Sequence, residues 1–545
     1  MAHLQLSQAF EQSYKSFEAY PCNLVYQPSY LGVLKAYRDR LNNAAAKLFT
    51  ANIGEVHIPF RDLLPNEQAF EKRNIFDDEA LKDWIGDRST IDSLTSTHVG
   101  DLATRRDPKC RFVFLWGGHS RRPLNITRQM LIRIASYHQV MPEYLDFISV
   151  FGQQSSSREL RFSGFREQVL LSKPVKGLSM PSLGRSGRQY QLCYNLKSVA
   201  CLSAADTTLK QKEWSIRQAA FYHQFDVGHG TTLWIVTKGD LEIKERLQEM
   251  TGKDGRPEDR AFGTPEECFR SSLAVHLLYC HWSTEAWRWY LQWLEDVTDH
   301  ESHIAVLGPR DPSRSRREYT PEDLQTLHNY EEKTHEAIMI LEANAGILTS
   351  LRSFYTRLVD RRDFSLQGNC QEDVLTFAAR VDDMVHDSKM QLSRARLLSR
   401  IVADRKNLVL QHLQHQATEK MEALTMSTYN TGVMSQKEAI AVRIITVVTL
   451  VYLPATFVST FFSTDVIRFQ NQNGDSDATS GLATSPNETS YGSFSKIALL
   501  RWLQVTLPLS ALTLAIGYIA FRIADKKRKR ASLPLYWTAS KADTS

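Results

Sequence analysis

The chain has 545 residues, 42% of them hydrophobic and 23% charged, and its 66 Lys+Arg against 61 Asp+Glu give a net charge of +5. The ordinary contents of 25 glycines and 18 prolines exclude a collagen-like or largely disordered chain. Because the net charge is small for this length, the composition does not support nucleic-acid binding, and we expect no nucleic-acid partner.

The N-terminal segment carries neither the apolar core of a signal peptide nor the arginine-rich character of a transit peptide. The seven cysteines all precede residue 371 and show no C-x-x-C spacing, which argues against a zinc ribbon or a redox motif. We therefore interpret the cysteines as buried thiols and expect the first 430 residues to lie in the reducing cytosol.

Residues 1–310 mix β-like runs with helical stretches, which predicts an α/β (α+β) domain with too few strands for a barrel. The β-like runs are residues 111–116, 145–151 and 231–237, and the helical stretches are residues 124–138 and 265–296. The glycine-rich segment 177–187 lacks the phosphate-binding order of a P-loop, so we predict a flexible connection there. Four tryptophans on one predicted helix, Trp282, Trp287, Trp289 and Trp293, indicate packing rather than a ligand cage.

Catalytic signatures are not found in this domain. There is no nucleophile elbow, zinc-protease motif or kinase signature, so we predict neither an enzyme nor a bound cofactor. His223 and His229 are candidate metal ligands, but a structural pair at the end of a strand is the preferred interpretation.

A long helical region follows. Between residues 322 and 453 there is no proline, and glycine occurs only at positions 346, 368 and 432. We predict a stalk over residues 311–437, with one helix from about Pro321 to Asp363 and a second from about Gln371 into the membrane. The second helix carries apolar residues at three- and four-residue steps: Val374, Phe377, Val381, Met384, Val385, Leu392, Ala395, Leu398 and Val402. A rod of roughly 90 residues spans about 135 Å, so we expect neighbouring helices in a coiled coil, from other copies of the chain.

A possible metal cluster lies farther along this helix. His412 and His415 share a helical face with Glu419 and Glu422. Polar neighbours at these spacings are ordinary on exposed helices, so a solvated face is the preferred interpretation.

Two charge-free apolar runs occupy the C-terminal part, residues 444–462 with 19 residues and residues 502–521 with 20. Each is about 30 Å long as a helix, which matches the hydrocarbon core of a bilayer. We predict transmembrane helices at 438–463 and 496–523, and the alternative is a pair of buried core helices.

The flanking charges predict the orientation of this hairpin. A basic run at residues 526–530 follows the second span, so by the positive-inside rule the tail 524–545 and the N-terminus are cytosolic. The loop 464–495 then faces outward, and it contains a glycosylation sequon at Asn487. The sequon favours the plasma membrane over the mitochondrial membrane.

The first span has a stripe of hydroxyl side chains. Five hydroxyls and one leucine recur at steps of three and four: Thr446, Thr449, Leu453, Thr456, Thr460 and Ser463. Such a stripe can join helices in a membrane, but we favour pore lining, with oxygen-rich rings for a hydrated cation and Leu453 as a hydrophobic gate.

The run LPATFVSTFF at residues 453–462 resembles the first membrane helix of CorA-type divalent-cation channels, in their fungal branch. Residues 502–514 resemble the second helix of that branch. The resemblance implies a funnel-shaped homopentamer in the lipid bilayer, with a cytosolic α/β domain, a stalk continuous with the pore-lining helix, and a divalent cation, Mg²⁺ in this family, as cargo.

The chain departs from this family at the pore mouth. Ser463, Thr464 and Asp465 stand where the family has Gly-Met-Asn. A ring of Asp465 carboxylates would concentrate cations and make these three residues the predicted metal site, but it puts selectivity for Mg²⁺ in question. The alternatives are a zinc-type transporter of the same fold and a non-conducting, membrane-anchored interaction or signalling protein.

Overall fold

A computed structural model of the chain describes residues 6–463 and 496–531, apart from internal gaps at 66, 68, 92–97, 102–104, 119–121, 154–160, 203–207, 210–212, 239–240, 253–254, 257, 259–260 and 308–317. The chain divides into two compact units, Met1–Gln414 and His415–Ser545. Helix α10 contributes residues to both units, which are described separately below.

The elements follow one another from a mixed α/β region to long helices. The helices are α1 (Gln8–Lys15), η1 (Phe17–Ala19), α2 (Leu31–Leu48), η2 (Ile53–Glu55), α3 (Asp78–Ile85), α4 (Arg128–His138), α5 (Tyr144–Ile148), α6 (Leu241–Thr251), α7 (Pro265–Thr284), α8 (Trp287–Leu307), α9 (Pro321–Val359), α10 (Gln367–Ser463) and α11 (Lys496–Ala531). The strands are β1 (Ile58–Leu63), β2 (Glu71–Ile75), β3 (Arg88–Ile91), β4 (His98–Asp101), β5 (Cys110–Leu115), β6 (Phe165–Leu170), β7 (Ser179–Met180), β8 (Arg185–Ser186), β9 (Gln189–Cys201), β10 (Trp214–Asp226) and β11 (Thr232–Lys238).

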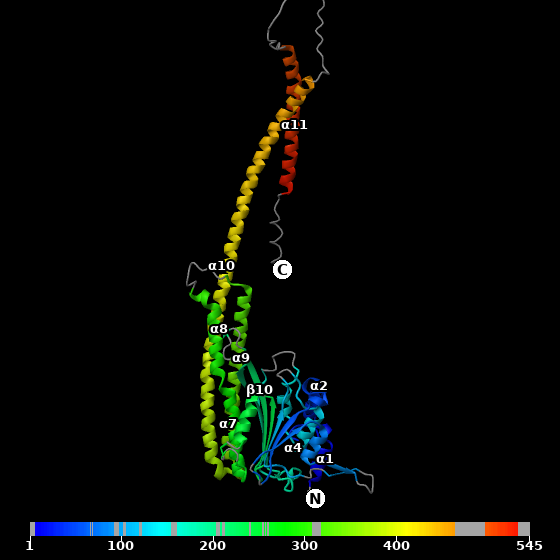
Figure 1. Cartoon of the computed structure of the whole chain (residues 1–545), viewed down its shortest axis with the longest axis vertical. Coiled ribbons are helices and arrows are strands. Elements are labelled where there is room, and N and C mark those ends of the chain that lie inside the picture. Colours follow the sequence, from blue (N-terminus) through cyan, green and yellow to red (C-terminus); the bar gives the residue numbers. More distant parts are fainter. Residues whose placement is uncertain are drawn as a thin grey trace, which may run out of the picture. The chain divides into compact units, whose positions relative to one another are not determined.

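The first unit is built on an open seven-stranded sheet with the order β2-β1-β5-β11-β10-β9-β6. Strands β5 and β11 pair in parallel, and the other neighbouring strands of this sheet pair antiparallel. Helices α1, α2 and α4 cover one face of the sheet, and α7, α8 and α9 lie on the other (Figure 1). The predicted α/β class is therefore confirmed for this unit.

The two faces of the sheet bury separate apolar clusters, because successive side chains of a strand point to opposite faces. Phe60, Val113 and Tyr222 pack against the N-terminal helices. Phe112 and Trp234 belong instead to the cluster that α7, α9 and the start of α10 close. The sheet is thus covered on both sides.

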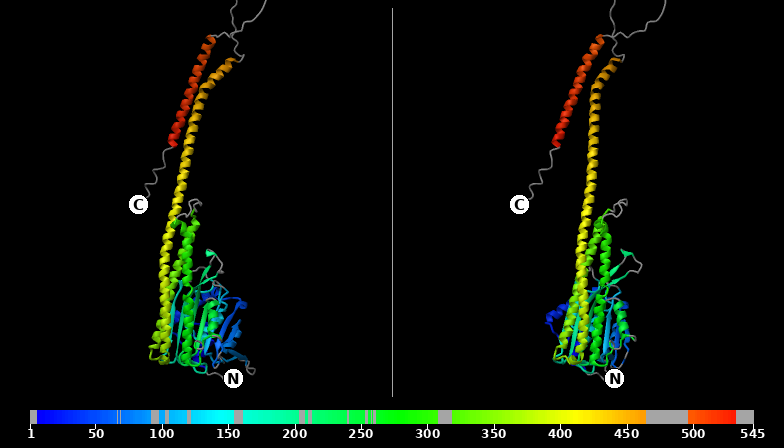
Figure 2. Two further views of the ribbon diagram at one scale, coloured as in Figure 1. Left: turned by 60° about the vertical axis from the view of Figure 1, so that its left-hand side comes forward. Right: turned by 90° about the vertical axis from the view of Figure 1, so that its left-hand side faces the viewer.

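The helical layer explains the apolar stripe of the predicted stalk. All nine stripe residues from Val374 to Val402 are buried. They pack against α7, α8 and α9 of the same chain, which run beside α10 in Figure 2. The expectation that other copies cover this stripe is therefore wrong for residues 374–402. The predicted break between the two long helices is confirmed, since α9 ends at Val359 and α10 begins at Gln367.

Helices α7 and α9 begin with the same local signal. In each a proline follows a threonine N-cap, and a capping box joins Thr264 to Glu267 and Thr320 to Asp323. These bonds satisfy orphan N–H groups of the first turn, so the sequence itself starts both helices at these points.

Several local predictions are wrong. Residues 145–151 are not a strand, because Tyr144–Ile148 forms the short buried helix α5. Segment 177–187 is an ordered turn, with β7 paired to β8 and Leu183 fully buried. The four tryptophans sit on two helices, α7 and α8, and Trp289 is exposed. Cys201 is also exposed, unlike the five buried cysteines.

A buried ionic network crosses strands β1 and β5. The Arg111 guanidinium binds the Asp62 carboxylate, with Nη2–Oδ2 at 2.6 Å and Nε–Oδ1 at 3.0 Å. The remaining Nη1 of Arg111 lies 3.2 Å from Nε2 of His138. Because arginine only donates, this nitrogen must accept, so His138 is neutral. Nearby, the Arg185 Nε donates to Asp107 at 2.6 Å.

A second buried chain contains two histidines. Tyr194 Oη lies 2.7 Å from Nδ1 of His276, whose Nε2 lies 3.2 Å from Nδ1 of His223. His223 Nε2 in turn lies 3.1 Å from the Thr232 hydroxyl. The partner of His223 is therefore His276 and not the predicted His229.

These histidines predict that the first unit loses stability in mild acid. Burial lowers the pKa of His138, His223 and His276 well below the usual 6.5, and Arg111 and His276 add to this at His138 and His223 respectively. Below pH 6.5 the unfolded chain therefore takes up protons that the folded chain does not, and each histidine costs up to about 1.4 kcal/mol per pH unit. The thermal midpoint should change little between pH 8 and 7 and fall between pH 6.5 and 5.5. A midpoint constant to pH 5.5 would contradict this assignment.

Candidate cation pathway

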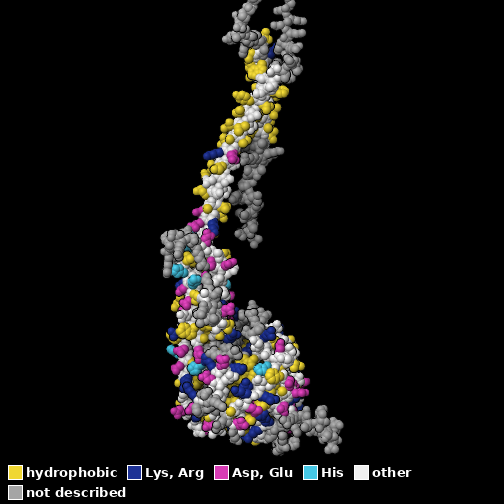
Figure 3. Space-filling view, viewed as in Figure 1, with side chains coloured by type: hydrophobic (Ala, Val, Ile, Leu, Met, Phe, Trp, Pro, Cys, Tyr) yellow, Lys and Arg dark blue, Asp and Glu magenta, His cyan; other side chains and the backbone are white. Residues whose placement is uncertain are grey.

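Two helices of the second unit are long and apolar enough to cross a membrane. The apolar windows lie in α10, up to Thr460, with a mean hydropathy of 1.9, and in α11 at Leu499–Ile523, with 1.6. Only 6% of each window is buried. Hydrophobic side chains gather on the face of α10 shown in Figure 3, and large exposed ones include Ile444, Val448, Tyr452 and Phe457. Such exposure suits lipid or neighbouring helices and not water.

Helix α11 packs against one side of the apolar part of α10. A Cβ placed on Gly517 would lie 3.3 Å from Cδ1 of Leu450, so the glycine allows a close approach of the two helices. The Trp502 indole Nε1 donates to the Ser459 hydroxyl at 3.1 Å. On α10, Pro454 and Val458 are buried. These contacts could not be predicted from the sequence, since residue spacing alone does not show which face a second helix covers.

The predicted hydroxyl stripe lies on another face of α10. At 100° per residue, Thr449, Thr456 and Thr460 lie more than about 100° from the mean direction of Leu450, Pro454 and Val458. Thr446, one turn before Leu450, lies at the edge of the stripe, about 80° from that direction. All four threonines are exposed, and Leu453 on the same stripe is 61% exposed. The protomer therefore covers one side of α10 and leaves the hydroxyl stripe open.

The hydroxyl hydrogens of this stripe are already used within the helix. Thr446 and Thr449 donate to the carbonyls of Val442 and Ile445 at 2.6 and 2.8 Å. Thr456 and Thr460 donate in the same way, to carbonyls three and four residues earlier. A hydroxyl that donates to its own backbone presents its oxygen lone pairs outward, so the stripe offers acceptors for the water shell of a cation.

Pro454 interrupts the backbone ladder within this stripe. Its nitrogen cannot donate to the carbonyl of Leu450, and such a gap is tolerated in membranes where neighbouring groups compensate. The Thr456 hydroxyl donates to two carbonyls in the turn just before it, those of Tyr452 and Leu453, each at 3.0 Å.

The predicted mouth lies at the edge of the described chain. Ser463 is the last residue of α10 and is exposed. Thr464, Asp465 and the sequon residue Asn487 lie outside the described residues. The structure therefore places one of the three predicted mouth residues, on the same helix as the threonine stripe.

The candidate metal residues of the stalk are spread along α10. His415 Nδ1 lies 3.5 Å from Glu419 Oε1 on an exposed face. The ring of His412 lies 6.0 Å from that of Tyr319, within the first unit. Among the described residues, no group of three or more His, Cys, Asp or Glu side chains could hold a metal ion.

Comparison with known proteins places the chain in one family. Residues 12–306, more than half of the chain, match the family model described as CorA-like transporters. This match covers the α/β region and not the apolar spans on which the sequence resemblance concentrated. No curated protein matches the chain.

Solved structures give matches of low similarity. The CorA magnesium transporter from Methanocaldococcus jannaschii has 10% identity and a TM-score of 0.34, over 86% of this chain and 98% of its own. The full-length CmaX protein has 9% identity and a TM-score of 0.34, over 85% and 96%. The ZntB cytoplasmic domain from Vibrio parahaemolyticus has 7% identity and a TM-score of 0.30, over 65% and 98%.

Proposed function

The chain belongs to the CorA-like transporters, and from this premise we propose that it is a passive channel for divalent cations in a membrane. The observation that carries the proposal is the uncovered hydroxyl stripe of α10. Helix α11 packs elsewhere on α10, so the stripe is available to line a path between several copies. Members of this family are transporters, and the proposal assigns no enzymatic role.

The proposed assembly is a homopentamer. Exposed apolar side chains continue along α10 in the second unit, including Met421, Leu424, Met426 and Tyr429. Large apolar residues at such positions favour contact with further copies of the helix. In this arrangement the first unit and both termini lie in the cytosol, and the loop 464–495 faces outward at the plasma membrane.

The proposed cargo is a hydrated hard cation such as Mg²⁺. Hydroxyl oxygens suit Mg²⁺, which keeps several of its waters, whereas Zn²⁺ prefers imidazole and thiolate ligands. A zinc-type transporter remains the second candidate, because Asp465 replaces the neutral amide of the family motif. Competition between Mg²⁺ and Zn²⁺ in one flux assay distinguishes the two.

The test is divalent cation flux into vesicles that contain the purified full-length protein. The wild type should conduct, and the pair Thr449→Val and Thr456→Val should lower the flux about tenfold, because each substitution removes the hydroxyl oxygens of one ring at nearly constant side-chain volume. Thr513→Val on α11 is the matched control, since its hydroxyl bonds to the Ser510 carbonyl at 2.9 Å away from the stripe, and it should leave flux unchanged.

Two outcomes would change the proposal. No flux through correctly assembled wild-type protein would favour the non-conducting interaction or signalling protein. Equal losses in the stripe and control variants would place the conduction path elsewhere than on the threonine face of α10.

A further inference from the structure

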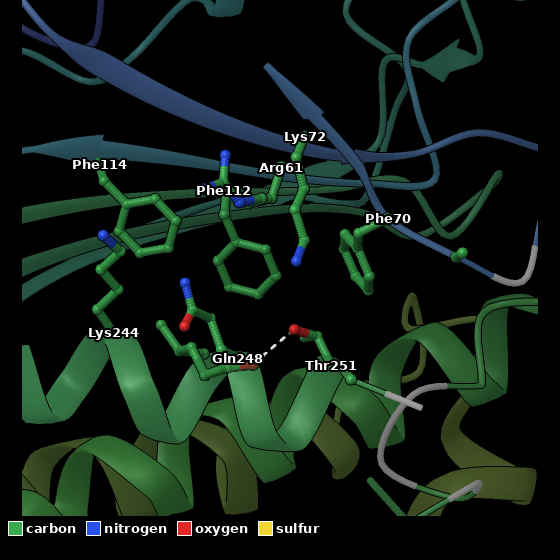
Figure 4. Close-up of a pocket in the computed structure, with 11 residues that line it drawn as sticks. Arg61, Phe70, Lys72, Phe112, Phe114, Lys244, Gln248 and Thr251 are labelled. Carbon is green, nitrogen blue, oxygen red and sulfur yellow. Dashed lines mark hydrogen bonds between the residues drawn. The ribbon is translucent and has the colours of Figure 1, made fainter. Parts of the chain in front are cut away.

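A cavity of about 250 Å³ lies between the edge of the sheet and helix α6 in the first unit. Strands β1, β2 and β5 line one side, and α6 lines the other (Figure 4). Side chains point into it from both sides, with Arg61 and Phe112 from the sheet and Lys244 and Gln248 from the helix. The cavity is far from the apolar spans in sequence and shares no residue with the proposed pathway.

The cavity gathers positive charge. Arg61 and Lys72 stand directly opposite each other on β1 and β2, and Lys244 projects from α6. The described residues that line the cavity include no carboxylate. Arg61, Lys72 and Lys244 therefore face the same cavity, and no described lining residue supplies a carboxylate to balance their charge.

The carboxylates of the same strands point to the other face. Asp62 and Glu71 are the next opposed pair along β1 and β2. Asp62 binds Arg111, and Glu71 binds Arg105 at 2.8 Å. The strand pair therefore places its two carboxylates, Asp62 and Glu71, in ion pairs on one face and brings Arg61 and Lys72 together at the cavity.

Holding Arg61 and Lys72 together, apart from the carboxylates, lowers the stability of the fold when no anion is bound. Like charges directly opposite each other on neighbouring strands are destabilising. Burial lowers the pKa of Arg61, and burial together with Lys244 and Arg61 lowers the pKa of the nearby His57. The contribution of Lys244 and Arg61 to the His57 shift indicates a positive local potential, whereas the Arg61 shift reflects burial alone. Cations held together against this repulsion are typical of an anion-binding site.

The remaining lining is aromatic. Phe112 and Phe114 lie nearly parallel, with ring centroids 6.2 Å apart and planes inclined by 9°. Phe70 closes the far side, its centroid 6.0 Å from that of Phe112. Aromatic walls favour a flat apolar body by stacking or edge contacts. The cavity volume lies just below the range of about 300–1,000 Å³ that holds drug-sized ligands, which limits the ligand to about a mononucleotide.

We propose that this cavity binds a small anion with a planar aromatic body, of the class of a nucleoside monophosphate. The cations Arg61, Lys72 and Lys244 hold the anionic group, the phenylalanines contact the ring, and the amide of Gln248 is placed to bond to its polar edge. The site shares no residue with the proposed conduction path, so this proposal can be tested independently of the proposed channel function.

The test is calorimetric titration of the full-length protein in detergent with three probes in the presence of EDTA: AMP, adenosine and inorganic phosphate. AMP should bind at least about tenfold more tightly than either fragment, because only AMP uses both the cations and the rings. Lys72→Gln and Lys244→Gln should each weaken AMP binding about tenfold, the expected loss of one charge-assisted contact.

The chain offers a matched control on the same strand. Arg73→Gln removes a cation from β2 at a position that points to the opposite face, and AMP affinity should stay within about twofold. The thermal midpoint of the Lys72→Gln variant should not fall, and should stay equal or rise slightly, because the substitution removes a repulsion between opposed cations. Absence of AMP binding to the wild type, equal affinities for AMP and either fragment, or unchanged AMP affinity in both lysine variants would overturn the proposal.

Discussion

Replacing Asp465 with alanine should lower the initial rate of divalent cation uptake about tenfold or more at low salt. In the proposed pentamer this residue follows the hydroxyl stripe, so its carboxylates form a ring at the entrance of the pore. A ring of one sign of charge at a narrow mouth raises the local cation concentration and the entry rate by about 10- to 1,000-fold. The measurement is metal uptake by vesicles that contain equal amounts of wild-type and variant protein.

The salt dependence and a control in the same loop sharpen this prediction. The difference between wild type and Asp465→Ala should shrink as ionic strength rises, because exposed charges are screened. Asp477→Ala removes the same charge from loop 464–495 but lies 12 positions farther along, and it should change uptake by less than about twofold. Uptake unaffected by Asp465→Ala would remove Asp465 from the pathway, and equal losses in both variants would indicate a general loop charge.

The long helices could be predicted from the sequence because their signals are local. The scarcity of proline, the charge-free runs and the flanking basic residues each act within a few helical turns. The threonine-capped starts of α7 and α9 are equally local. What covers the helices is not local: the stripe of Val374 to Val402 fits contact with another copy as well as contact with α7 to α9, and the structure shows the latter.

The strands were harder to predict because many of their buried residues are polar. Strands β9 and β10 have 13 residues each and carry Asn195, Lys197 and His223 in the interior. These side chains are satisfied by distant partners; the Lys197 ammonium, for example, donates to the Phe162 carbonyl at 2.7 Å. A pattern of alternating apolar residues does not reveal such partners. The opposite error occurred at Tyr144–Ile148, where a short apolar run fits a buried helix as well as a strand.

The hydroxyl stripe and the cationic cavity also differ in whether they depend on local sequence or on contacts between distant residues. The hydroxyl stripe follows from helical spacing within one segment, and Thr449 and Thr456 could be assigned to it without a structure. Only the structure, through contacts such as that between Trp502 and Ser459, shows that α11 packs on another face of α10 and leaves the hydroxyl stripe uncovered. The cationic cavity was not predicted at all, because Arg61 and Lys72 become neighbours only through the register of β1 with β2.

Replacing Asp62 with alanine should destabilise the first unit by about 3–5 kcal/mol. Asp62 is fully buried and Arg111 is 3% exposed, so the variant leaves a guanidinium without its counter-charge in the interior. The loss should appear as a fall of roughly 5–10 °C in the thermal midpoint of the full-length protein, followed by tryptophan fluorescence.

A double variant separates the charge from the packing. In Asp62→Leu with Arg111→Met both charges are absent, so no unpaired charge is buried, although the Nε2 atom of His138 loses its donor. Most of the lost stability should therefore return. Glu71→Ala, directly opposite Asp62 on β2, removes an exposed partner of Arg105 and should cost less than about 1 kcal/mol. If the double variant were as unstable as Asp62→Ala, the role of the pair would be packing. If Glu71→Ala lowered the free energy of unfolding as much as Asp62→Ala, burial would not explain the importance of the Asp62–Arg111 pair. The expected order therefore tests the division of charge across this strand pair, with ion pairs on one face and the cations of the cavity on the other.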